Sequence, residues 1–181
     1  MASILKVDTI QDQSGNNIIN ENAGTITIGK SGDTINLASG ATAGFGKVLQ
    51  VVSATDSTSR STSSTSFVTA SNTLSVSITP SSTSSKIFIM CSTSTGVTNQ
   101  AFYTIFRDAT NLGTAQGMVE NYFDDADGDN RSSICMSILD SPNTTSSTTY
   151  QLYFKVNSAS ENADIQSNNT KASITAFEIG A

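Results

Sequence analysis

The sequence predicts an all-β protein in which a short N-terminal β-ribbon precedes an antiparallel, jelly-roll-like β-sandwich. Charged residues make up only 13% of the 181 residues, and serine and threonine take their place, as is typical of strands with one solvated face. Apolar residues alternate with polar ones in many short segments, and turn residues separate these segments. No segment has the spacing of an amphipathic helix.

Residues 1–40 are expected to form the ribbon. Here "TITIGKSG" is followed by "TINLASG", so that Ile26 and Ile28 are matched nine residues later by Ile35 and Leu37. Alternation places these four side chains on one face of two short strands, yet an isolated ribbon of this size is marginally stable in water. We therefore expect the four residues to mediate self-association, with three copies wound about a common axis. A disordered arm is the alternative interpretation.

Residues 41–46 are rich in glycine and alanine and are expected to link the ribbon to the head, residues 47–181. The head contains strand patterns at nearly regular intervals. We expect strands at 47–54, 66–70, 72–80, 85–93, 100–108, 115–123, 131–140, 149–159 and 171–180. Eight or nine strands of this length fit a jelly roll.

The last two of these segments have the clearest patterns. Tyr150, Leu152, Phe154 and Val156 alternate with polar residues, which predicts that they share one face of their strand. The final segment, 171–180, is strongly apolar. It is therefore expected to be central in its sheet or buried against another subunit.

The composition argues against an enzyme and against several classes of partner. The chain has no histidine, which excludes histidine-based acid–base catalysis and most zinc sites. Nine basic and 15 acidic residues give a net charge of −6, so no nucleic acid is expected as a partner. No apolar run approaches about 18 residues, and no signal-peptide pattern is present. We therefore expect no membrane insertion, no secretion and no cofactor.

The acidic segment "FDDADGDNR" invites comparison with calcium-binding loops, with Asp125, Asp127 and Asp129 as candidate ligands. The spacing fails the EF-hand test, because position one would be Phe123 and position twelve Ile134. A calcium loop of another kind remains an alternative. We favour a solvated acidic loop without a metal ion.

The two cysteines, Cys91 and Cys135, lie in the apolar runs "KIFIMCST" and "SSICMSIL". Buried free cysteines behave as small hydrophobic residues. Because no secretory signal is present, we expect two buried, reduced thiols and no disulfide.

Several segments resemble tail-fibre-like virion proteins of tailed bacteriophages, particularly those of marine and cyanobacterial hosts. The opening "ASILKVDTIQDQSGNNIINENAGTITIG" is similar to their N-terminal segment. The pieces "SSKIFIMCST", "YTIFRDATNLG", "SPNTTSSTTYQLYFKVN" and "ASITAFEIGA" are similar to their C-terminal β-domain. The resemblance covers most of the chain.

This resemblance implies a homotrimer with a short β-structured stem and a head of the tumour-necrosis-factor or C1q type. It also implies a virion surface protein, with the N-terminal segment bound to a capsid or tail protein and a host-surface glycan as the natural ligand. The chain is short for a fibre, because fibres usually carry a long shaft. A capsid decoration protein is therefore the main alternative, and a calcium-dependent carbohydrate-binding module is a third.

Overall fold

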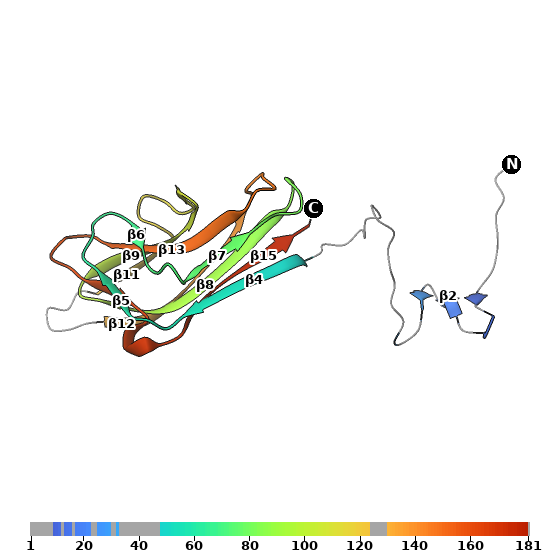
Figure 1. Ribbon diagram of the computed structural model, residues 1–181. Coiled ribbons are helices and arrows are strands. Elements are labelled where there is room, and N and C mark those ends of the chain that lie inside the picture. Colours follow the sequence, from blue (N-terminus) through green and yellow to red (C-terminus); the bar gives the residue numbers. More distant parts are fainter. Residues whose placement is uncertain are drawn as a thin grey trace. The chain divides into compact units, whose positions relative to one another are not determined.

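The computed structural model describes residues 9–11, 13–15, 17–22, 25–29, 32, 48–123 and 130–180. The chain forms two compact units, Met1–Gly44 and Phe45–Ala181. The described residues of both units form β-strands and turns, with one short 3-10 turn and no α-helix (Figure 1). The prediction of an all-β fold is confirmed.

The N-terminal unit contains a three-stranded antiparallel sheet of β1 (Thr9–Gln11), β2 (Asn17–Asn22) and β3 (Thr25–Ile28), in that order. Ile10 pairs with Ile19, and Ile19 pairs with Ile28. All three isoleucine side chains are exposed. The sheet therefore presents a row of apolar side chains, one from each strand, which we call the isoleucine row.

The second unit contains twelve described strands. They are β4 (Val48–Asp56), β5 (Arg60–Thr62), β6 (Val68–Thr69), β7 (Ser75–Ile78), β8 (Lys86–Val97), β9 (Gln100–Arg107), β10 (Thr110–Asn111), β11 (Val119–Tyr122), β12 (Asn130–Asp140), β13 (Thr148–Val156), β14 (Ala163–Ile165) and β15 (Ala172–Ile179). A 3-10 turn, Ser167–Asn169, lies between β14 and β15.

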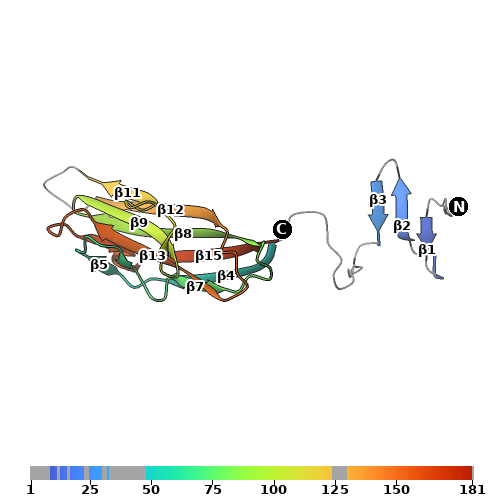
Figure 2. The same ribbon diagram turned by 90° about the horizontal axis from the view of Figure 1, so that it is seen from above.

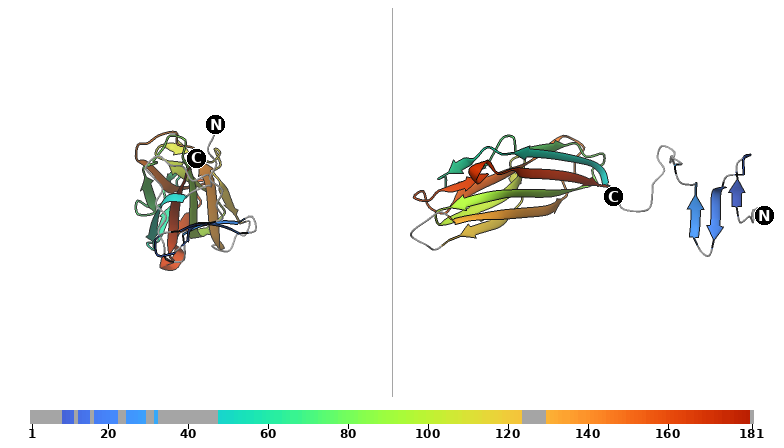
Figure 3. Two further views of the ribbon diagram at one scale, coloured as in Figure 1. Left: turned by 90° about the vertical axis from the view of Figure 1, so that its right-hand side faces the viewer. Right: turned by 90° about the horizontal axis from the view of Figure 1, so that it is seen from below.

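These strands form two antiparallel sheets that enclose one core, an arrangement consistent with a β-sandwich (Figure 2). The first sheet has the order β4-β15-β8-β14-β5, and β12 pairs with the other edge of β8. The second has the order β10-β9-β13-β6, with β11 on β9 and β7 on β13. In the right-hand view of Figure 3 the teal β4, red β15, green β8 and orange β12 lie side by side.

The alternation predicted for β13 is confirmed. Tyr150, Leu152, Phe154 and Val156 are all buried in the core between the sheets. The prediction for the closing strand is confirmed as well, because β15 lies between β4 and β8.

The structure differs from the prediction in β8, which continues beyond the apolar run as far as Val97. The extension is serine- and threonine-rich, and the sequence analysis took it for a loop. Its inward-facing Thr95 is buried but hydrogen-bonded, because the amide nitrogen of Asn121 donates to Thr95 Oγ1 at 3.1 Å and to Ser132 Oγ at 2.8 Å. Buried polar groups are tolerated when they are paired in this way.

Candidate assembly surface

The residues singled out in the sequence fall partly outside the described part of the chain. Ile28 ends β3 and belongs to the isoleucine row, and Ile26 lies in the same strand. Ile35 and Leu37 lie outside the described residues, so their predicted match to β3 stays a prediction.

The acidic segment also lies outside the described residues, and with it Asp125, Asp127 and Asp129. Among the residues that are described, no group of three or more Cys, Asp or Glu side chains could hold a metal ion. The prediction of a solvated loop therefore stays a prediction.

The most distinctive surface is a row of apolar side chains across the outer face of the first sheet. Phe177 on β15 pairs with Val51 on β4 and with Phe88 on β8, and Phe88 pairs with Leu139 on β12. The two phenylalanine rings have their centroids 6.2 Å apart. We call these four residues the apolar band.

The apolar band is exposed, and further apolar side chains adjoin it. Val51 and Leu139 are each 54% exposed. Met90, next on the outer face of β8, is also exposed, as are Val48 and Leu49 at the start of β4. Contiguous exposed apolar surface of this kind marks an interaction site more often than scattered single residues do.

The band and the two rows beside it contain no charged side chain. These rows comprise Val51, Phe177, Phe88 and Leu139; Ser53, Thr175, Met90 and Ser137; and Thr55, Ser173, Ser92 and Cys135. The chain as a whole has a net charge of −6. An identical, equally acidic chain can therefore dock on this face without burying an unpaired charge, whose desolvation would oppose association.

A buried carboxylate fixes the end of β15 that carries the band. Glu178 follows Phe177 and is fully buried. Its oxygens accept hydrogen bonds from Ser81 N at 2.7 Å, Ser81 Oγ at 2.6 Å and Gln50 Nε2 at 2.7 Å. Burial alone would raise the pKa of Glu178, but these hydrogen bonds outweigh it and lower the pKa to about 2. The ionised Glu178 ties β15 to β4 and to the loop after β7, with Phe177 on the outer face.

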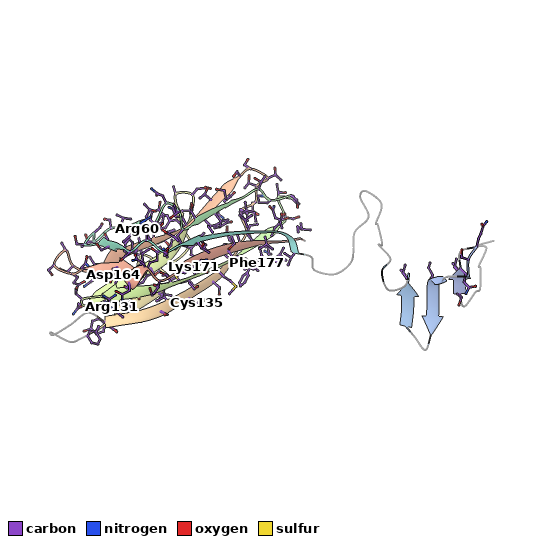
Figure 4. All side chains as sticks on the ribbon, turned by 60° about the horizontal axis from the view of Figure 1, so that its bottom comes forward. Arg60, Arg131, Cys135, Asp164, Lys171 and Phe177 are labelled. Atoms are coloured by element: carbon purple, nitrogen blue, oxygen red, sulfur yellow. The ribbon has the colours of Figure 1, made fainter. Side chains whose placement is uncertain are left out.

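The two cysteines occupy opposite faces of the first sheet. Cys91 is buried, and burial raises the pKa of its thiol to about 12. Cys135 is exposed on the outer face (Figure 4), so the prediction that it is buried is wrong. Its neighbours Ile134 and Met136 point inward, and alternation along the strand therefore turns Cys135 outward. Both thiols are free, as expected.

A shallow hollow of about 140 Å³ lies next to the band. It is lined by Met90, Cys91, Ser92, Cys135, Ser173, Thr175 and Phe177. Its volume is below the usual 300–1,000 Å³ of a small-molecule site. The surface is therefore suited to another protein chain better than to a small molecule.

Comparison with known proteins identifies no relative: no family model matches the chain, and no curated protein matches it. Among the described residues, no helix is long and apolar enough to cross a membrane. The function is therefore inferred from the surface itself.

Proposed function

We propose that the protein is a non-enzymatic virion surface protein of a tailed bacteriophage, a fibre- or spike-like homotrimer that serves host attachment. The observation that carries the assembly part is the uncharged apolar band across β4, β15, β8 and β12. The resemblance of both terminal segments to tail-fibre-like proteins supports the position on a virion. In this account the chain is made in the host cytoplasm, and its N-terminal segment binds a capsid or tail protein.

The same proposal assigns the second unit to the jelly roll of the tumour-necrosis-factor and C1q type. The strand orders support this assignment. The first sheet contains β4-β15-β8-β12, and the second contains β7-β13-β9-β11. The first and last of these eight strands, β4 and β15, are neighbours, and the chain crosses repeatedly between the sheets, as in a fold built from two Greek keys.

An energy estimate indicates why both units are needed for assembly. Fully burying a Val, Leu or Phe side chain contributes about 1.5–3 kcal/mol, so the exposed parts of the four band residues offer on the order of 3 kcal/mol per copy. Association costs about 4–15 kcal/mol in lost freedom of motion. The band alone therefore gives weak association, which the isoleucine row strengthens because the linker makes the second contact intramolecular.

The proposal is tested by locating the protein on particles. Virions whose genome encodes the chain are labelled with an antibody against it and viewed by electron microscopy. Gold particles at the tail are expected, and purified protein is expected to adsorb to host cells and to compete with the phage. Absence of label from intact virions would contradict the proposal.

A capsid decoration protein is the second candidate, and the short chain favours it. The described part of the N-terminal unit is one sheet of three short strands, which is little for a fibre shaft. This candidate predicts label on the head, binding of purified protein to capsids that lack it, and particles that break more easily without it.

A further inference from the structure

A polar groove crosses the same outer face near the end opposite to the apolar band. Two overlapping hollows, of about 270 Å³ and about 250 Å³, share Ser94 on β8, Ser133 on β12 and Thr170 just before β15. Ser94 lies six residues beyond Phe88 on the same strand, or about 20 Å along it. The chain enters this unit at the band end, where β4 begins. The groove therefore lies at the far end of the sheet.

The lining of the groove is unusual for this chain because it contains two cations. Arg131 lines one hollow and Lys171 the other, and both side chains are labelled in Figure 4. Arg131 approaches Asp164 at 3.7 Å, beyond hydrogen-bond distance, and its side chain is 49% exposed. Lys171 has no ion-pair partner among the described residues. Two cations and one carboxylate leave a local positive charge on a chain whose net charge is −6.

Hydroxyl and amide groups surround the two cations. Ser94, Ser133 and Thr170 contribute hydroxyls that both donate and accept hydrogen bonds, and Asn168 contributes a side-chain amide. Ser94 and Thr170 also bond to each other, which holds the turn before β15 against β8. The groove thus combines anion recognition with groups that match the hydroxyls of a sugar.

The turn beside the groove has two features that folding alone does not favour. Gln166, Asn168 and Asn169 have φ angles of 54°, 57° and 56°, a left-handed conformation that is costly for residues other than glycine. Gln166 is also fully buried, and neither atom of its side-chain amide has a hydrogen-bond partner in the described structure. Backbone strain and an unpaired buried polar group cluster at functional sites.

We propose that this groove binds an acidic saccharide, a sugar unit that carries a carboxylate or sulfate group. The guanidinium of Arg131 suits a planar or multidentate oxyanion, and Lys171 adds a second positive charge. The hydroxyls of Ser94 and Ser133 and the amide of Asn168 bond to the sugar hydroxyls. The inference rests on the host-attachment part of the proposed function and specifies its ligand class. Three grooves in one trimer would add weak contacts to a strong attachment.

The test is a calorimetric titration of the full chain with four probes: an oligosaccharide of glucuronic acid, a sulfated glucose oligosaccharide, an uncharged glucose oligosaccharide and inorganic sulfate. We expect at least one acidic oligosaccharide to bind about tenfold more tightly than the uncharged one, because one charge-assisted hydrogen bond is worth about a factor of ten or more. The preferred probe distinguishes a carboxylate ligand from a sulfate ligand. Equal affinity for charged and uncharged sugars, or no binding of either acidic sugar, would overturn the inference. Sulfate binding as tightly as the sulfated sugar would show that the sugar is not recognised.

Variants locate the site. Arg131→Gln and Lys171→Gln are each expected to weaken the binding of the acidic sugar about tenfold. Lys86→Gln is the matched control, because Lys86 is an exposed lysine at the band end of the same sheet. It is expected to change affinity less than twofold. An equal loss in all three variants would mean non-specific attraction and would also refute the groove.

Light scattering on the same samples separates this inference from the assembly proposal. A trimer that binds no acidic sugar would refute the groove and leave assembly intact. A monomer that binds the sugar through Arg131 would support the groove and refute trimeric assembly.

Discussion

Replacing Leu139 with serine tests the apolar band where the change does least harm to the isolated chain. Leu139 lies on the outer face of β12, pairs with Phe88 and is 54% exposed. Exposed surface substitutions usually change stability by no more than about 0.5 kcal/mol. A large effect of Leu139→Ser on assembly therefore cannot come from unfolding of the single chain.

The magnitude follows from the exposed fraction. Full burial of a leucine side chain contributes about 1.5–3 kcal/mol, so burial of the exposed half on assembly contributes about 1 kcal/mol per copy. Three copies lose about 3 kcal/mol together, which corresponds to roughly a hundredfold fall in the association constant of the trimer. Tyr122→Ser is the matched control, because Tyr122 is also 54% exposed but lies on β11 in the second sheet.

The assay is sedimentation equilibrium over a dilution series, with the melting temperature of each variant measured at low concentration. Leu139→Ser is expected to move dissociation to a higher protein concentration without lowering the melting temperature of the monomer. Tyr122→Ser is expected to leave dissociation unchanged. The reasoning is refuted if the two variants shift dissociation equally, or if neither shifts it.

Three further predictions concern the head. In Gly96→Ala the new Cβ would overlap the carboxylate of Asp164, so we expect a loss of about 1–3 kcal/mol in urea unfolding; a loss that persists undiminished in an Asp164→Ser background would contradict this cause. Glu178 has a pKa lowered from 4.5 to about 2, so its stabilisation is present above pH 4.5 and is lost as the pH falls towards 2. It amounts to about 3 kcal/mol at most, and Glu178→Gln should therefore show a flatter fall in unfolding free energy between these pH values than the parent chain; parallel curves would count against it. Maleimide should label Cys135 in dilute protein, more slowly at concentrations that favour assembly, and Cys91 only after unfolding; labelling of Cys135 that is independent of concentration would argue against its burial in the assembly.

Features that depend on one segment could be predicted from the sequence. The alternation of Tyr150, Leu152, Phe154 and Val156 identifies a core face because the period of a strand is two residues. The dense apolar pattern of 171–180 identifies a central strand because both of its edges and one face are covered. These local patterns were sufficient for the all-β fold class.

Features that depend on pairing between distant segments could not be predicted in this way. The apolar band joins Val51, Phe88, Leu139 and Phe177 only through the register of four strands. The one local signal was that "KIFIM" and "TAFEI" are apolar on both faces, which is typical of strands covered on both sides. The groove was missed for the same reason, since Arg131 and Lys171 lie on different segments that meet only in the folded sheet.

Cys135 illustrates a different limit. An apolar neighbourhood in the sequence suggested burial, but the side chains that are buried are Ile134 and Met136 on either side of it. In a strand, the hydrophobicity of a window says less about one residue than its parity within the alternation.

The mass of the full chain in solution, measured by light scattering over a range of concentrations, tests the central claim most directly. The account predicts a species of three times the 18.9 kDa chain mass that dissociates on dilution, because the contribution of each apolar contact is modest. A mass of 18.9 kDa at every accessible concentration would contradict the claim that the apolar band and the isoleucine row are assembly surfaces.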